Sequence, residues 1–252
     1  MSKILPFLLA VSFGLPTAQV WAQGNTTNDS FSKAKRMLEK EVYFDHRETF
    51  YCRAPFDVKK NVTLPEGFKT EKHVKRALRV EWEHVVPAEN FGQAFVEWRE
   101  GDERCVDNKG KHFKGRACAE KVNEEFRYMQ ADMYNLYPAI GAVNAARSNY
   151  RFQMLPGEPS SFGTCEMKIS GRAVEPPSYA RGEIARTMLY MQQAYSRYRM
   201  SSAQQKLMQA WNSEDPVDAW ECRRAARIEE LQGNVNAFVK DACLKANLPY
   251  KP

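Results

Sequence analysis

Apolar residues recur along this chain with two different periods. They follow helical spacing in residues 30–43 and again in residues 122–133, so both segments are predicted to form amphipathic helices. In residues 78–83 each apolar residue alternates with a charged one, which predicts a strand with one buried face. Residues 49–52 predict a second, shorter strand. Helices and strands are therefore expected to be mixed in the first half of the chain.

The second half of the chain is predicted to be mostly helical. Residues 165–176 predict a β-hairpin around Ser170-Gly171, and Pro138 is expected to open a helix because proline suits the first helical turn. Further helices are expected after Pro177, from Ser201 with Gln204 at capping-box spacing, from Asp215-Pro216 to about Gly233, and after Asn234. Together these elements favour a single α+β domain that is rich in helix.

The first 22 residues are predicted to be a secretory signal peptide. Lys3 gives a positive start, an apolar run follows from Ile4 to Leu15, and small residues precede a cleavage position after Ala22. A membrane anchor is the alternative, but the apolar run is too short to span a bilayer. The protein is thus expected in the periplasm or outside the cell, without a membrane anchor, as residues 23–252.

The composition agrees with a secreted globular protein. Of 252 residues, 43% are hydrophobic and 27% carry charge of mixed sign, which excludes a disordered chain. The net charge of +6 is compatible with a polyanionic partner without requiring one.

Six cysteines follow the predicted signal, an even number that indicates three disulfides in an oxidising compartment. No CxxC motif occurs, which argues against a zinc cluster or a redox dithiol. Six cysteines allow 15 pairings. Cys105 and Cys118 flank a polar loop and could pair locally. The preferred set is Cys105–Cys118, Cys222–Cys243 and, by elimination, Cys52–Cys165.

The sequence EWEHVVPA, residues 81–88, places a carboxylate beside an imidazole at the end of the predicted strand. Glu83 offers oxygen ligands suited to Mg²⁺ or Ca²⁺. His84, with an ordinary pKa of about 6.5, is suited to taking a proton from water. Neighbouring strand residues point to opposite sides, so the two would approach a bound group from two directions. The pair predicts metal-assisted hydrolysis; a solvated surface pair is the alternative.

A second polar segment, DMYNLYPAIGAVNAARSN, covers residues 132–149. The amide oxygen of Asn135 could complete a metal site with Glu83. Arg147 and Asn149 belong to a polar, positive cluster that is suited to phosphates. In the alternative interpretation Asn135 is a cap or turn residue and Arg147 an ordinary surface charge.

Four segments together resemble the bacterial endonuclease I family: RVEWEHVVPA, NLYPAIGAVNAARSN, RGEIARTMLYM and LMQAW…PVDAWECRRAARIEELQGN. They cover nearly all of the chain after the signal and keep the family's order. The resemblance implies a nuclease domain of the ββα-metal type, in which a strand, a long loop, a second strand and a helix form the active site. It implies Mg²⁺-dependent cleavage of DNA, and often of RNA, with little sequence preference and 5′-phosphate ends.

Carried over to this chain, the resemblance makes His84 the general base and gives Glu83 and Asn135 one Mg²⁺, which Mn²⁺ or Ca²⁺ could replace. It places a phosphate-holding arginine before the second strand. Arg104 in WREGDERC matches best and Arg99 is the alternative, because acidic residues interrupt the family's Gly-Gly-Arg-Lys run.

Further contacts to nucleic acid are expected from Arg79, Arg147 and Asn149, and the protein is expected to act as a monomer on DNA and RNA. Two other functions are alternatives to a nuclease. One is a catalytically inactive nucleic-acid-binding protein for uptake, and the other is a disulfide-stapled structural protein of the envelope. Intact Glu83, His84 and Asn135 argue against an inactive protein.

Overall fold

The computed structural model describes residues 23–252, so the predicted signal peptide lies outside the described residues. The first half contains α1 (Phe31–Met37), the π-helical η1 (Leu38–Val42), α2 (Val74–Ala77), β1 (Val80–His84), α3 (Ala88–Gly92), α4 (Val96–Arg99), α5 (Arg116–Val122), α6 (Glu124–Gln130), η2 (Met133–Asn135), β2 (Leu136–Ile140) and α7 (Gly141–Arg147). The second half contains β3 (Arg151–Phe152), β4 (Lys168–Ser170), β5 (Ala173–Glu175), η3 (Ser178–Ala180), α8 (Arg181–Ala194), α9 (Ser202–Glu214), α10 (Ala219–Gln232) and α11 (Ala237–Lys245).

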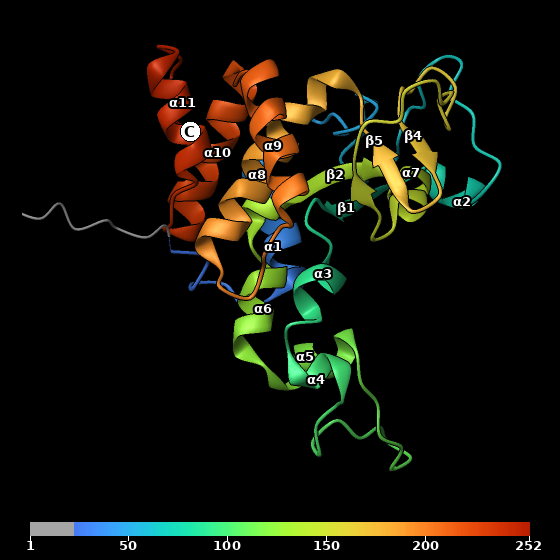
Figure 1. The fold of residues 1–252 in the computed structure, drawn as a ribbon, viewed down its shortest axis with the longest axis vertical. Helices are drawn as coiled ribbons and strands as arrows, with labels where there is room; N and C mark the ends of the chain where they lie inside the picture. The colour runs from blue at the N-terminus through green and yellow to red at the C-terminus, as the bar shows by residue number, and fades with distance from the viewer. Residues whose placement is uncertain (1–22) are drawn as a thin grey trace, which may run out of the picture.

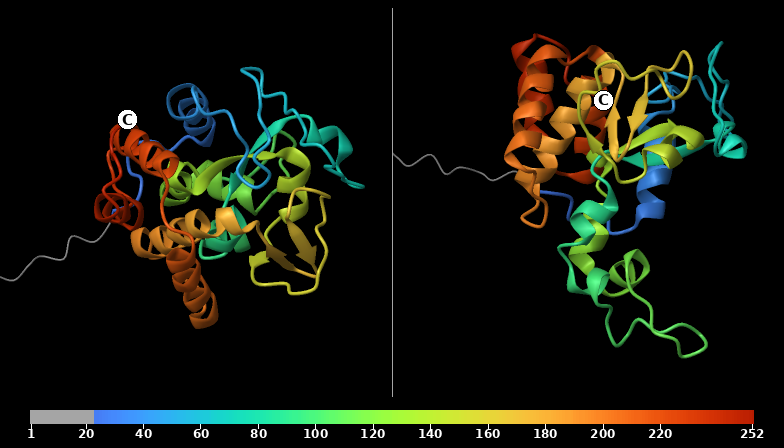
Figure 2. Two further views of the ribbon diagram at one scale, coloured as in Figure 1. Left: turned by 90° about the horizontal axis from the view of Figure 1, so that it is seen from above. Right: turned by 45° about the vertical axis from the view of Figure 1, so that its right-hand side comes forward.

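The antiparallel ribbon of β1 and β2 lies at the centre of the molecule (Figure 1). Helices α8 to α11 pack on one side of it, and α2, α7 and the small sheet β3-β5-β4 lie on the other (Figures 1 and 2). Helices α3 to α6 form a lobe that extends away from the ribbon and ends in a long loop (Figure 2). The α+β prediction is confirmed.

The predicted strand over residues 78–83 is present as β1, which begins two residues later at Val80 and is buried on both faces at its end. Leu78, expected to be buried, is 60% exposed, whereas Glu83 is only 2% exposed. Pro138 was predicted to open a helix and instead lies inside β2, opposite Trp82. A proline is tolerated there because the ribbon has only two strands, so each strand is an edge. Its carbonyl oxygen accepts a 2.8 Å hydrogen bond from the backbone of Phe50.

Two other predictions for the first half are wrong, one entirely and one in part. The segment 49–52 is a turn and not a strand, because Thr49 folds the chain back by accepting hydrogen bonds from the backbone of Arg53 and Ala54. The helical pattern of residues 122–133 is split at Asn123, whose side chain caps α6. The helix predicted over residues 30–43 is confirmed as α1 and η1 in sequence.

In the second half the hairpin at Ser170-Gly171 is confirmed as β4 and β5. Ser201 caps α9 by accepting a hydrogen bond from the backbone of Gln204, as the capping-box spacing predicts. The next two helices begin later than predicted, since their N-caps are Asp218 and Asn236.

The structure contains the three predicted disulfides and leaves no free cysteine among the described residues: Cys52–Cys165, Cys105–Cys118 and Cys222–Cys243. The second closes the long loop of the lobe, and the third joins α10 to α11. Within residues 23–252, none of the helices has the length and apolar character needed to cross a bilayer.

Candidate active site

His84 ends β1 at the point where the ribbon meets α1 and the lobe. Its ring packs on Phe31, with 4.9 Å between ring centroids, and its Nε2 lies 2.9 Å from the backbone carbonyl oxygen of Gln130. A carbonyl oxygen can only accept, so Nε2 carries the proton and Nδ1 keeps its lone pair. Burial, and secondarily the charge of Arg116, lower the pKa of His84 to about 3. The imidazole is therefore neutral at physiological pH, and Nδ1 carries no proton.

Glu83 points to the other face of β1 and is buried. The Tyr51 hydroxyl donates a 2.8 Å hydrogen bond to its Oε1. The Nε of Arg147 lies 3.2 Å from the same oxygen, as an ion pair without hydrogen-bond alignment. Burial raises the pKa of Glu83 to about 6 even though both partners favour the charged form.

Arg147 does not lie on the surface, where the sequence led us to expect a phosphate contact. It is 1% exposed and donates hydrogen bonds to the carbonyl oxygens of His84 (3.1 Å) and Val85 (2.6 Å). Its guanidinium also packs over the ring of Phe152. The reason is that α7 lies along β1, which turns the last residue of the helix inward. Arg147 is thus an internal support for the end of β1.

Asn135 is buried as well, and both ends of its side-chain amide form hydrogen bonds with the backbone. Its Oδ1 accepts a 2.7 Å hydrogen bond from the backbone of Val86, and its Nδ2 donates a 2.9 Å bond to the carbonyl oxygen of the same residue. These contacts hold the segment after His84 against the start of β2. Asn135 was predicted to share a metal ion with Glu83, but neither of these hydrogen bonds goes to Glu83.

A carboxylate–amide pair that the sequence did not reveal lies nearby. Asn144 on α7 donates a 3.1 Å hydrogen bond to Glu81 on β1. Arg76 and Arg79 also bind the Glu81 carboxylate. Burial alone would raise the pKa of Glu81, but the hydrogen bonds from Arg76, Asn144 and Arg79 hold it below its ordinary value. The sequence does contain a signal for this pair. Glu81 and Glu83 are two residues apart and so share one face of the strand, and Asn144 and Arg147 are three residues apart and so share one face of the helix.

An open cleft of about 530 Å³ runs between α1 and β1. Glu81 and Asn144 lie on one wall, and Phe31, which also touches His84, lies on the other. Four cationic side chains line it, Lys35, Arg36, Lys60 and Arg79, together with the acidic Glu39, which pairs with Lys60 at 2.9 Å. The cleft therefore combines positive charge, an aromatic ring and oxygen donors beside a buried neutral imidazole, a combination that suits a nucleic-acid backbone.

Known proteins resemble this chain over most of its length. Residues 45–243 match the family model described as Endonuclease I. The chain belongs to the endonuclease I family. It is 41% identical to an extracellular deoxyribonuclease of Aeromonas hydrophila, over 85% of this chain and 90% of that protein. It is 40% identical to a periplasmic deoxyribonuclease of the same species, over 85% of this chain and 86% of that protein. It is 34% identical to Endonuclease-1 of Buchnera aphidicola subsp. Acyrthosiphon pisum, over 87% of this chain and 84% of that protein.

Arg104 and Arg99, the two arginines predicted from the sequence to hold the phosphate, lie in the lobe of this endonuclease I chain. Arg104 is exposed in the long loop, and its Nε and Nη2 donate hydrogen bonds to the Asp102 carboxylate, at 2.8 and 2.9 Å. Arg99 is also exposed and donates to the carbonyl oxygen of Gln93. Neither contacts His84. Asn149, expected to contact nucleic acid, donates a 2.8 Å hydrogen bond to Glu89.

The oxygen donors of this endonuclease I chain suit a divalent cation better at Asn144 than at Asn135. Mg²⁺ retains several of its waters when it binds a protein. Asn144 and Glu81 border the open cleft and leave room for such waters. Glu83 faces α7 from the same side of β1 as Glu81, but its carboxylate is buried. The oxygen donors of Glu81 and Asn144 are of the kind that Mg²⁺ prefers in proteins.

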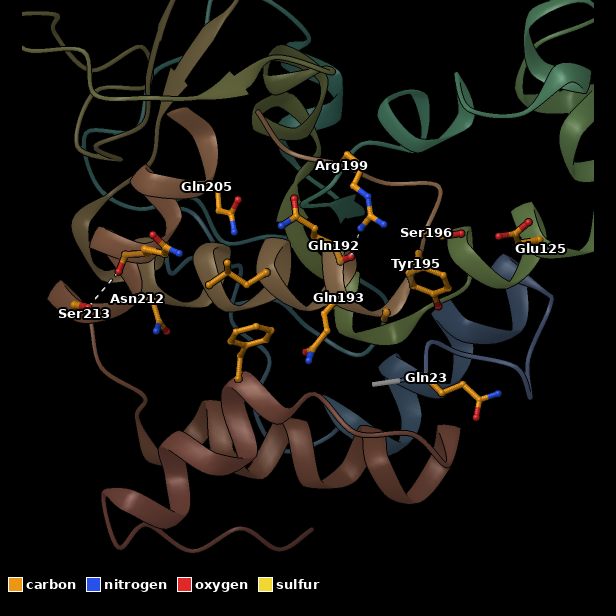
Figure 3. Close-up of a pocket in the computed structure, with 14 residues that line it drawn as sticks. Gln23, Glu125, Gln192, Gln193, Tyr195, Ser196, Arg199, Gln205, Asn212 and Ser213 are labelled. Atoms are coloured by element: carbon orange, nitrogen blue, oxygen red, sulfur yellow. Dashed lines mark hydrogen bonds between the residues drawn. The ribbon is translucent and has the colours of Figure 1, made fainter. Parts of the chain in front are cut away.

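A groove larger than this cleft lies elsewhere in the molecule. It has a volume of about 1000 Å³ and lies between α8, α9 and α11 (Figure 3). Its walls carry several side-chain amides: Gln23, Gln192, Gln193, Gln205, Gln209 and Asn212. None of the residues predicted to be functional lines it, so size alone does not identify the active site here.

Proposed function

We propose that this protein is a deoxyribonuclease that is secreted or exported to the periplasm and hydrolyses the phosphodiester bonds of DNA. Its relatives carry the names extracellular and periplasmic deoxyribonuclease. The observation that supports catalysis by this chain is the contact between His84 Nε2 and the carbonyl oxygen of Gln130, because it leaves Nδ1 ready to accept a proton.

In the proposed reaction, Nδ1 of His84 removes a proton from the water that attacks the phosphorus. A DNA strand lies in the cleft between α1 and β1, where Lys35 and Arg36 neutralise its phosphates. A Mg²⁺ ion bound here would stabilise the charge that develops on the phosphate and on the departing oxygen. RNA, which has the same phosphodiester backbone, is proposed as a second substrate, and 5′-phosphate ends as the products.

The residues proposed to hold that cation are Asn144 and a carboxylate of β1. Glu83 is the carboxylate that the family resemblance predicts, and Glu81 is the one that contacts Asn144. Asn135, the predicted amide ligand, is the less suitable donor because Val86 occupies both ends of its amide.

Nicking of supercoiled plasmid by the purified mature protein tests the proposal. Relaxed plasmid should form in Mg²⁺, not in EDTA, and should form again when excess Mg²⁺ is restored. Plasmid that is bound but remains supercoiled would indicate the inactive uptake protein. A salt titration that detects no binding to DNA would indicate the structural protein of the envelope.

A further inference from the structure

We infer that a pocket beyond the end of β1 binds a nucleoside monophosphate, apart from the cleft in which DNA is proposed to lie. The pocket has a volume of about 420 Å³ and lies where the segment after β1, α3, the end of α7 and the start of α9 meet. On α7, Asn144 borders the cleft and Arg147 lines the pocket. The inference goes beyond the proposed cleavage of DNA, because a mononucleotide contains no phosphodiester bond to cleave.

The charge of the lining favours an anion. Arg147, Arg151 and Arg199 line the pocket, and within residues 23–252 no aspartate or glutamate does. Arg151 and Arg199 are exposed, and their hydrogen bonds go to uncharged groups, the side chain of Gln153 and the carbonyl oxygen of Gln192. Two guanidinium groups at the pocket therefore carry positive charge that no carboxylate of the described chain neutralises, and each can bind a phosphate.

Two further donors in the lining have no acceptor in the part of the chain that the structure describes. Tyr198 is only 5% exposed, and its hydroxyl forms no hydrogen bond there. Burial raises the pKa of this hydroxyl, and the nearby charge of Arg147 offsets part of the rise. The Nε2 of Gln204 is enclosed and also lacks an acceptor. Donors that are removed from water without an acceptor are costly, and the oxygens of a phosphate would satisfy them.

The N-terminus of α9 borders the pocket as well, since its cap Ser201 and the residue Gln204 both line it. The first N–H groups of a helix have no acceptor within the helix, and their partial positive charge attracts phosphate. The Ser201 hydroxyl accepts from one of them, the N–H of Gln204. Tyr198 and Arg199 directly precede this helix in the chain. The phosphate is therefore assigned to the α9 end of the pocket.

The remainder of the lining suits a nucleobase better than a second anion. Tyr150 is half-buried and offers an aromatic ring on which a base can stack. Met188 and Met200 add adaptable apolar surface, and the amides of Asn90 and Gln93 can pair with the polar edge of a base. The pocket volume is near the lower end of the range for small-molecule sites, which fits one nucleotide and excludes a duplex.

The test is calorimetric titration of the mature protein with dAMP in EDTA. Wild type should bind dAMP with a Kd below about 1 mM. Tyr198→Phe removes only the hydroxyl and should raise this Kd about 2–10-fold, the scale of one hydrogen bond. The double variant of Arg151→Gln and Arg199→Gln should raise it at least about tenfold, because two charged donors are lost. Both arginines are exposed, so the double variant is expected to fold.

Arg36→Gln, in the cleft, is the control and should leave the Kd for dAMP unchanged. Deoxyadenosine and inorganic phosphate should each bind at least about tenfold more weakly than dAMP, because each satisfies only part of the lining. A 5′-phosphorylated tetranucleotide that displaces dAMP would show that the pocket also accepts the end of a DNA strand, and absence of displacement would restrict it to free mononucleotides.

Absence of dAMP binding up to about 5 mM would overturn the inference. So would a Kd that Arg36→Gln raises and Tyr198→Phe does not, since dAMP would then lie in the cleft. Inorganic phosphate that binds as tightly as dAMP would overturn the assignment to a nucleotide. Plasmid nicking in Mg²⁺ tests the proposed function independently, so that failure of either proposal is distinguishable from failure of the other.

Discussion

The backbone carbonyl oxygen of Gln130 lies 2.9 Å from Nε2 of His84, although the two residues are 46 positions apart. This contact joins the end of α6 to the end of β1 and sets the tautomer of the imidazole. The base thus depends on the lobe as well as on the ribbon, and the side chain of Gln130 extends the same link to Arg116.

Replacement of His84 by alanine should reduce DNA cleavage at least about a hundredfold, because the water loses its proton acceptor. DNA affinity should stay near the wild-type value, since the cations of the cleft are unchanged. Single-turnover cleavage and a filter-binding titration measure the two quantities. His112→Ala, in the exposed loop of the lobe, is the matched control. A His84→Ala protein that nicks plasmid at wild-type speed would place the base elsewhere.

Alanine at Asn144 and alanine at Asn135 should have different consequences. Asn144→Ala should raise the Mg²⁺ concentration for half-maximal cleavage at least about tenfold. Loss of a residue that only hydrogen-bonds to a metal ligand already lowers metal affinity by about that factor, and loss of a ligand should cost no less. A Mg²⁺ titration of initial rates measures it. An unchanged titration curve would remove Asn144 from the metal site.

Asn135→Ala should act mainly on stability. It removes two hydrogen bonds to Val86 in the interior, and each buried group left without a partner costs about 1–3 kcal/mol. Denaturant unfolding should show the loss, while the folded fraction keeps the wild-type Mg²⁺ dependence. If Asn135→Ala instead shifts the Mg²⁺ titration and Asn144→Ala does not, the pairing predicted from the sequence is correct.

The sequence predicted β1, the hairpin at Ser170-Gly171 and the Ser201 cap because each depends on residues that are close along the chain. It failed at Pro138, since only the pairing of β2 with β1 shows that this proline lies on a two-stranded ribbon. It also failed at Arg147. A basic residue at the end of a polar cluster is usually exposed, and nothing local indicates that α7 packs its Arg147 against a buried Glu83.

The Glu83–Arg147 pair can be tested directly. Arg147→Met should destabilise the protein by about 3–5 kcal/mol, because the buried carboxylate loses its counter-ion. Equilibrium unfolding in urea measures this loss. In the double variant with Glu83→Gln, part of the stability should return, since no uncompensated charge remains. Arg151→Met, at an exposed position nearby, is the control. A surface phosphate contact would instead lower DNA affinity and leave stability unchanged.

The last prediction concerns Glu183 on α8, which shares a small cavity with Tyr43 and Trp220. Burial, and next the nearby carboxylate of Glu221, raise the pKa of Glu183 from 4.5 to about 8. Glu221 keeps its own partner, Arg186, at 2.6 and 2.7 Å. Glu183 is thus expected to hold a proton in the folded protein over a pH range in which the unfolded chain has already released it.

The sign of the pH dependence follows from that difference. Between pH 4.5 and about pH 8 the unfolded state binds fewer protons at this position, so the contribution of Glu183 to stability becomes more unfavourable as the pH rises. Above about pH 8 both states are ionised and the cost stays constant. Glu183→Gln removes the ionisation. Its Tm should match wild type near the low end of this range, exceed it increasingly toward the high end, and keep a constant excess beyond. Glu214→Gln, exposed on α9, should show no such trend, and a Tm difference for Glu183→Gln that does not change with pH would contradict the raised pKa.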